Sequence, residues 1–219
     1  MQKTIWIILL LVMTGSIASA QRFEGGILGG FNGTQVEGDR YKGYNKPGLL
    51  LGAFVQTDLA PAVFAGMELK YSQKGARSRS LLKQNNIIGN ENGEIPEEPV
   101  SQKYIMRLGY AEMPFFVGFR TSEFISVVGG VSLGYLMHAA EYDDYGRFPE
   151  EDEKAFNHLD IQPFVGFQYD LLDQLKLDLR LAYSVLPIRG NPVDNYYWIS
   201  SQFNNVISMA LYYKFGRGY

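Results

Sequence analysis

The chain has 219 residues, of which 20 are Lys or Arg, 23 are Asp or Glu, two are His and none is Cys. This slightly negative charge argues against general nucleic-acid binding, which usually needs a basic surface. The lack of Cys excludes disulfides, thiolate metal sites, a cysteine nucleophile and a lipid anchor attached to cysteine.

Residues 1–20 have the pattern of a secretory signal peptide. Lys3 gives a positively charged start, an apolar run follows, and the segment ends in the small residues Ala18-Ser19-Ala20. The apolar run is shorter than the roughly 20 residues that a transmembrane helix needs. The sequence therefore predicts cleavage after Ala20 and one mature domain over residues 21–219.

Apolar and polar residues alternate along much of the mature chain. In residues 175–185, LKLDLRLAYSV, every second residue is apolar. Such alternation is typical of a β-strand whose two faces meet different surroundings. The pattern predicts eight strands, at 22–33, 46–58, 63–73, 104–119, 125–138, 159–169, 175–185 and 203–215.

These strands are long, and the connections between them alternate in length. Strands in soluble proteins usually have about 5–6 residues, whereas about 9–11 residues cross a bilayer at a tilt. The short connections are 58–62, 120–124 and 170–174, and the long ones are 34–45, 74–103, 139–157 and 187–202. Short turns at one end and long loops at the other are typical of bacterial outer-membrane barrels. The sequence therefore predicts an all-β fold, an eight-stranded antiparallel up-and-down transmembrane β-barrel with short periplasmic turns and long extracellular loops.

Aromatic residues fall near both ends of the predicted strands, as expected where a barrel meets the two membrane interfaces. The predicted inner girdle contains Phe23, Phe119, Phe124, Tyr169, Tyr213 and Phe215. The predicted outer girdle contains Tyr71, Tyr104, Tyr135, Tyr183, Trp198 and Phe203. The alternative is a soluble lipocalin-like ligand-binding barrel, because alternation alone does not distinguish an inward from an outward apolar face.

The polar face of the strands predicts a charged interior. Eight strands enclose a space that side chains just fill, and polar groups in such a space must pair with one another. We expect one interior polar network made by Glu68, Lys70, Glu112, Gln162, Lys176, Asp178 and Arg180.

The segment 104–119 is irregular, because its apolar residues change from even to odd numbers. A one-residue bulge near Ala111-Glu112 would return them to one face, and the neighbouring Pro114 fits such a defect because it cannot donate to the ladder.

Three stretches resemble a known family. NKPGLLLGAF (45–54), MELKYSQKGAR (67–77) and YAEMPFFVGF (110–119) are similar to recurring segments of the PorT-like outer-membrane β-barrel family of Bacteroidetes. The resemblance implies an eight-stranded barrel in the outer membrane of a Gram-negative bacterium. The namesake of that family is implicated in the secretion of proteins to the cell surface.

Few residues are suited to chemistry. His138, His158 and Asp160 form the best candidate site, because alternation predicts that all three point inward near the outer rim. A hydrogen-bond network at the rim is the simpler interpretation of them, because a short motif is weak evidence for a site. The stretch 139–155 holds seven acidic residues, which suits either divalent cations or a solvated loop. No catalytic residue, metal site or cofactor is predicted.

We therefore expect a small non-enzymatic outer-membrane barrel that takes part in surface assembly, protein export or binding through loops 74–103 and 139–157. Its expected partners are outer-membrane lipid and envelope or secretion-machinery proteins, and nucleic acid is not among them. The alternatives are an outer-membrane enzyme that acts on lipid or peptide at the outer rim, and the soluble lipocalin-like barrel.

Overall fold

The computed structural model describes residues 23–38, 43–78, 104–143, 145–147, 155–190 and 201–215. The strands are β1 (Phe23–Glu37), β2 (Lys46–Ala60), β3 (Val63–Lys74), β4 (Ile105–Arg120), β5 (Ile125–Tyr142), β6 (Leu159–Leu172), β7 (Leu175–Tyr183), β8 (Arg189–Gly190) and β9 (Ser201–Lys214). Within these ranges, no helix has the length and apolar character needed to cross a membrane.

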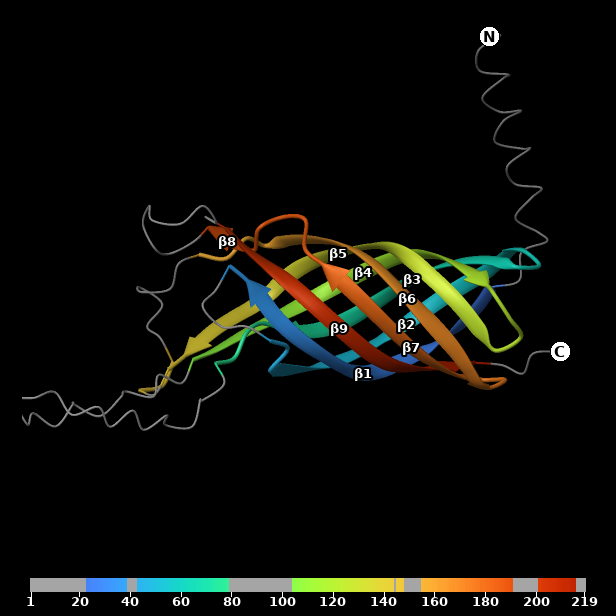
Figure 1. Cartoon of the computed structure of the whole chain (residues 1–219), viewed down its shortest axis with the longest axis horizontal. Coiled ribbons are helices and arrows are strands. Elements are labelled where there is room, and N and C mark those ends of the chain that lie inside the picture. Colours follow the sequence, from blue (N-terminus) through green and yellow to red (C-terminus); the bar gives the residue numbers. More distant parts are fainter. Residues whose placement is uncertain are drawn as a thin grey trace, which may run out of the picture.

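The strands form one closed antiparallel barrel (Figure 1). Each strand from β1 to β6 pairs with the next, β7 pairs with β9, and β9 pairs back with β1. The two-residue β8 adds to β9 at its first residues. Eight long strands in the described part of the chain therefore close without a free edge, which is the requirement for a sheet in lipid. The predicted fold class is confirmed.

The connections divide the barrel into two different ends. The turns 61–62, 121–124 and 173–174 lie at one end, which we call the short-turn end. The described ends of the chain also lie there, because the Phe215 backbone N–H donates to the Gly25 carbonyl. The strand ends that the longer connections join lie with β8 at the opposite end, which we call the long-loop end (Figure 1).

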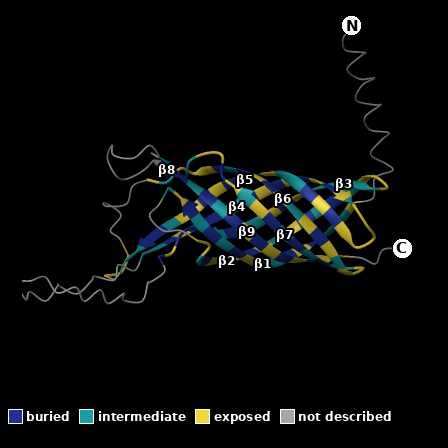
Figure 2. Ribbon diagram, viewed as in Figure 1, coloured by how far each residue is buried: buried dark blue, intermediate teal, exposed yellow. Residues whose placement is uncertain are grey.

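The barrel is apolar outside and largely polar inside. Along β7, Lys176, Asp178 and Arg180 are buried, whereas Leu181 is 55 % exposed. The same alternation gives the wall its chequered pattern of burial (Figure 2). A soluble barrel such as a lipocalin has the reverse arrangement, with its apolar face inward. The lipocalin-like alternative is therefore wrong.

Aromatic side chains mark both ends of the outer wall. At the short-turn end the exposed rings are those of Phe23, Phe119, Phe124, Tyr169, Tyr213 and Phe215. At the long-loop end Tyr135 is exposed, and Tyr183 stacks on Phe203. Tyr104 differs from the prediction, since its hydroxyl contacts Glu141 inside the mouth. Trp198 lies outside the described residues.

The register of β4 against β5 shifts by one residue near the long-loop end. Gly109 pairs with His138, and the next residue, Tyr110, pairs with Leu136. Met137 is therefore an extra residue of β5, and it forms a β-bulge. Beyond this bulge the inward and outward positions of β5 exchange.

The bulge predicted near Ala111-Glu112 is wrong, because β4 itself keeps one phase. Met106, Leu108 and Tyr110 point inward and are fully buried, while Arg107 between them is exposed. The change from even to odd apolar residues in the sequence therefore marks a change in the side chains that line the lumen. The interior is polar at mid-height and apolar near the long-loop end.

Glycines let large rings fill the narrow lumen. A Cβ on Gly118 would lie 2.1 Å from the ring of Phe64, and one on Gly26 would lie 2.6 Å from the ring of Phe54. Because a methyl group cannot be that close to a carbon atom, only glycine fits where these rings lie against the wall.

Candidate functional site: a filled lumen and its mouth

Arg180 is at the centre of the charged interior. Its Nη2 donates to Glu68 Oε1 at 2.7 Å, and its Nε lies 2.9 Å from Asp178 Oδ1. Tyr212 donates to Glu68 at 2.8 Å, and Gln168 donates to Asp178 at 2.8 Å. One cation thus faces two carboxylates, both almost fully buried, which is how charges are tolerated in a medium that screens them poorly.

Aromatic rings surround the same guanidinium. Its Cζ lies 4.8 Å from the ring centre of Phe164, 5.4 Å from that of Phe116 and 5.7 Å from that of Tyr212. Phe64 packs edge-on against Phe116 towards the short-turn end. These contacts hold the Arg180 side chain on several sides and occupy the cross-section of the barrel.

Lys74 makes a second charged centre nearer the long-loop end. Its Nζ contacts Glu112, lies 3.2 Å from Asp160 Oδ2 and donates to Gln162 Oε1 at 2.7 Å. Asn204 donates to the same oxygen of Asp160 at 3.0 Å. Alternation had ended the strand at residue 73, one residue before Lys74, so the sequence prediction missed this cation.

Lys70 joins the two centres. Its Nζ lies 3.5 Å from Glu112 Oε2 and 3.8 Å from Glu68 Oε2. The structure therefore brings together six residues of the predicted network, which are Glu68, Lys70, Glu112, Gln162, Asp178 and Arg180. Lys176 is also buried, but its Nζ lies 3.7 Å from Asp170 Oδ1 near the short-turn end, apart from this network.

Apolar side chains close the lumen above the charged centres. We call this layer the apolar plug, and its members are at most 4 % exposed: Val36, Ala76, Met106, Leu108, Tyr110, Leu136 and Ile188. Ile188 comes from the segment 187–202, which was predicted as a loop because it shows no alternation.

A cluster around Arg189, which we call the mouth clamp, covers the apolar plug. Both terminal nitrogens of Arg189 donate to Glu141 at 2.7 Å, and its Nε donates to Gln202 at 2.8 Å. The guanidinium also lies 4.4 Å from the ring centre of Phe156. Burial, followed by the hydrogen bond to Glu141 and its negative charge, raises the pKa of the Tyr104 hydroxyl well above its ordinary value. Tyr104 therefore stays protonated and donates to Glu141.

The structure does not bring the histidines and Asp160 into one site. His138 follows the Met137 bulge and is exposed on the outer wall, and His158 is exposed and stacks on Tyr135 at 5.6 Å. Asp160 is on the inner face, where it is 1 % exposed and pairs with Lys74. The predicted inward orientation of both histidines is wrong, because the bulge exchanges the faces of β5 and because His158 precedes β6.

No metal centre is evident either. In the part of the chain that the structure describes, no group of three or more His, Asp or Glu residues could hold a metal ion. Most of the acidic stretch, residues 144 and 148–154, lies outside the described residues.

Several solved barrels have a similar fold. Ail, the attachment invasion locus protein of Yersinia pestis, was solved in complex with the heparin analogue sucrose octasulfate. It is 12 % identical, with a TM-score of 0.50 over 89 % of this chain and 99 % of that one. Neisserial surface protein A is 10 % identical, with a TM-score of 0.49 over 90 % and 99 %. OprG of Pseudomonas aeruginosa is 11 % identical, with a TM-score of 0.37 over 89 % and 95 %.

No curated protein matches the sequence. The family described as "Outer membrane protein beta-barrel domain" matches residues 18–189, which is more than half of the chain. An apolar outer wall, a closed ladder and short turns at one end are the features that such a domain requires in lipid. The chain therefore belongs to this family of outer-membrane β-barrel proteins of Gram-negative bacteria.

Proposed function

We propose that this protein is a non-enzymatic barrel that takes part in surface assembly, protein export or binding through its extracellular loops. Loops 74–103 and 139–157 are the proposed contact regions, and envelope or secretion-machinery proteins are the proposed partners. The resemblance of 45–54, 67–77 and 110–119 to the PorT-like family supports the export role.

The filled lumen is the observation that carries this proposal. From the short-turn end to the long-loop end, the described part of the lumen contains the rings around Arg180, the ion pairs of Lys70 and Lys74, the apolar plug and the mouth clamp. Such an interior leaves little room for a solute to pass or for a substrate to bind between the strands. Recognition then takes place at the long-loop end, where the rigid barrel presents its loops.

A binding role also agrees with what is known of a barrel of the same fold. Ail, whose fold is similar, was crystallised in complex with a heparin analogue. The enzyme alternative has less support, because Asp160 faces inward whereas His138 and His158 are exposed.

Photo-crosslinking in intact cells tests the proposal. A photoreactive amino acid is placed at single positions in loops 74–103 and 139–157, and a matched control carries it at Leu179 on the lipid-facing wall. We expect discrete protein adducts from loop positions and none from the control. Deleting residues 80–101 should remove adducts while the barrel still shows heat-modifiable migration on gels.

Two results would count against the proposal. One is the absence of protein adducts from all positions in both loops. The other is a steady conductance of the purified protein in planar bilayers, since this would show that the lumen is open.

A further inference from the structure

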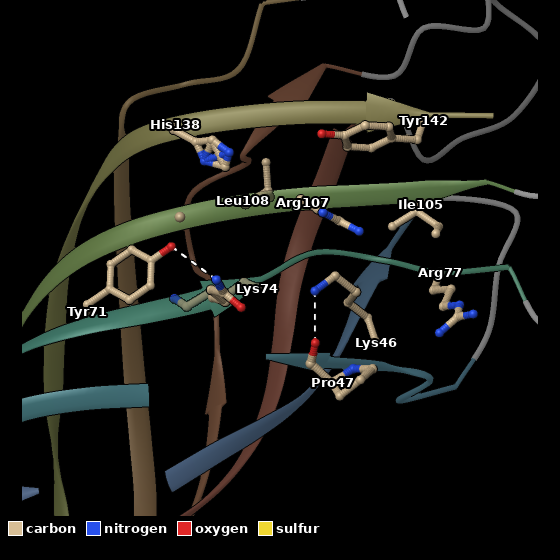
Figure 3. A pocket seen from close by; sticks show the side chains of 12 residues that line it. Lys46, Pro47, Tyr71, Lys74, Arg77, Ile105, Arg107, Leu108, His138 and Tyr142 are labelled. Atoms are coloured by element: carbon tan, nitrogen blue, oxygen red, sulfur yellow. Dashed lines mark hydrogen bonds between the residues drawn. The ribbon is translucent and has the colours of Figure 1, made fainter. Parts of the chain in front are cut away.

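A basic pocket lies in the barrel wall near the long-loop end. It has a volume of about 330 Å³ and is bordered by the ends of β2, β3, β4 and β5. The side chains of Lys46, Arg77 and Arg107 lie around it, together with those of His138 and Tyr142 on β5 (Figure 3). Arg107 is exposed on the outer wall, and Lys74 and Leu108, which also line the pocket, form its inner border towards the filled lumen.

Among the residues that the structure describes, three cations in this pocket lack a carboxylate partner. In the described ranges, none of Lys46, Arg77 and Arg107 forms an ion pair with Asp or Glu. The nearby acids are paired elsewhere, Glu112 with Lys74 and Glu141 with Arg189. Positive charges held together without a counter-ion repel one another, so an anion placed between them would be stabilised.

The excess of positive charge is clearest at Lys46. The residue is only 7 % exposed, and its Nζ donates to the Pro47 carbonyl at 2.9 Å. The charges that act on this ammonium are those of Arg107 and Arg77, both positive. A buried ammonium with only a neutral oxygen as its acceptor favours the approach of an anion.

Neighbouring groups fix the shape of the pocket. The Arg107 guanidinium lies 4.9 Å from the ring centre of Tyr142, which orients it. Gly109 forms part of the lining, and a Cβ there would lie 3.0 Å from the Tyr71 hydroxyl and 3.4 Å from His138 Nδ1. Glycine thus lets a tyrosine hydroxyl and an imidazole converge on one place, where both can hydrogen-bond to an oxyanion.

The position of the pocket indicates the source of the anion. Leu69, two residues before Tyr71 on β3, is 61 % exposed on the lipid-facing wall, and Leu51 on β2 is 50 % exposed. The cations thus lie directly beyond the apolar band, at the level of the aromatic residues that mark a membrane interface. A head-group phosphate of an outer-leaflet lipid occupies this level, and paired Arg side chains suit phosphate geometry.

We propose that Lys46, Arg77 and Arg107 bind a phosphate group on the head group of an outer-leaflet glycolipid. The acyl chains of this lipid lie along the outward residues of β2 and β3. The site holds lipid against the barrel wall, and it is independent of any partner of the loops.

Lipid binding by the purified full chain in detergent tests the site. The probes are phosphorylated lipid A, the same lipid without its phosphates, and inorganic phosphate, with bound lipid measured by native mass spectrometry. The variant carries Arg77→Gln and Arg107→Gln, and Lys46→Gln is a second, single variant. The control is Arg120→Gln, which removes one positive charge at the short-turn end, where Arg120 pairs with Asp58.

We expect the Kd for phosphorylated lipid A to rise about tenfold or more in the double variant and to change less than about twofold in the control. Lys46→Gln should weaken binding in the same direction, and the lipid without phosphate should bind the unaltered protein about tenfold more weakly. Equal Kd values for the double variant and the unaltered protein would overturn the proposal. Equal binding of the two lipids, or displacement of lipid by an equal concentration of inorganic phosphate, would also overturn it.

Discussion

Replacing Arg180 with Met should destabilise the barrel by about 3–5 kcal/mol, because the change leaves the buried Asp178 without a counter-ion and the buried Glu68 with only Lys70, 3.8 Å away. Glu68 and Asp178 lie 2.7 and 2.9 Å from the guanidinium and are each 1 % exposed. Each loses at least one charge-assisted hydrogen bond worth about 1.5–3 kcal/mol, and the two losses together give about 3–6 kcal/mol, which overlaps that range. The hydrogen bonds from Tyr212 and Gln168 remain and prevent a larger loss.

A triple variant separates the cost of unpaired charge from the cost of lost packing. Arg180→Met combined with Glu68→Gln and Asp178→Asn removes the cation and both anions at nearly constant volume. Because replacing a whole buried ion-pair group is often neutral or stabilising, we expect the triple variant to unfold within about 1 kcal/mol of the unaltered protein.

Urea titration in lipid vesicles measures both effects. The folded and unfolded forms separate on gels by their heat-modifiable migration, and the midpoint and slope give the free energy of unfolding. A loss below about 1 kcal/mol in the single variant would refute the reasoning, since the carboxylates would then not depend on Arg180. A triple variant as unstable as the single one would show that packing, and not charge, is decisive.

Alternation located the strands because lipid demands an apolar outer face along the whole membrane-spanning part of each strand. The segment 175–185 was predicted as a strand, and β7 spans Leu175–Tyr183. The predicted ends of β1 and β5 were each four residues short, and that of β5 was predicted at residue 138 and observed at Tyr142. There β5 has passed the Met137 bulge and left the membrane-spanning part, where lipid requires an apolar residue at every second position.

The mouth could not be predicted, because alternation has the same period whichever face is inward. In β4 the apolar residues Met106 and Leu108 were assigned to lipid, although they belong to the apolar plug. Ile188 and Arg189 gave no signal at all, since a two-residue strand is too short to show a period. Only the pairing of β8 with β9 brings them over the lumen.

The alternation along each strand predicted which residues of the network point inward, but not how far along the barrel axis they lie. Lys176 and Arg180 share the inner face of β7, yet four residues of strand separate them by about 13 Å. Lys176 therefore pairs with Asp170, while Arg180 reaches Glu68 on β3. The position of a residue along the barrel axis depends on the register between strands, which a single sequence does not reveal.

Three further predictions test the wall, the packing and the exposed histidines. Leu179→Arg places a charge in lipid and should cost about 2–4 kcal/mol in the urea titration, whereas Ala182→Ser on the inner face should cost less than about 1 kcal/mol; equal costs would contradict the assignment of faces. Gly118→Ala adds a methyl group 2.1 Å from a phenyl ring and should cost about 1–3 kcal/mol, so an unchanged urea midpoint would argue against that close packing. His138→Ala and His158→Ala should leave the masses of the lipid A and surface proteins of the cell unchanged, because both side chains are exposed and neither reaches the buried carboxylates that a general acid or base site would need. If either substitution altered one of those masses while the barrel still migrated as folded, the enzyme alternative would be favoured over the binding role.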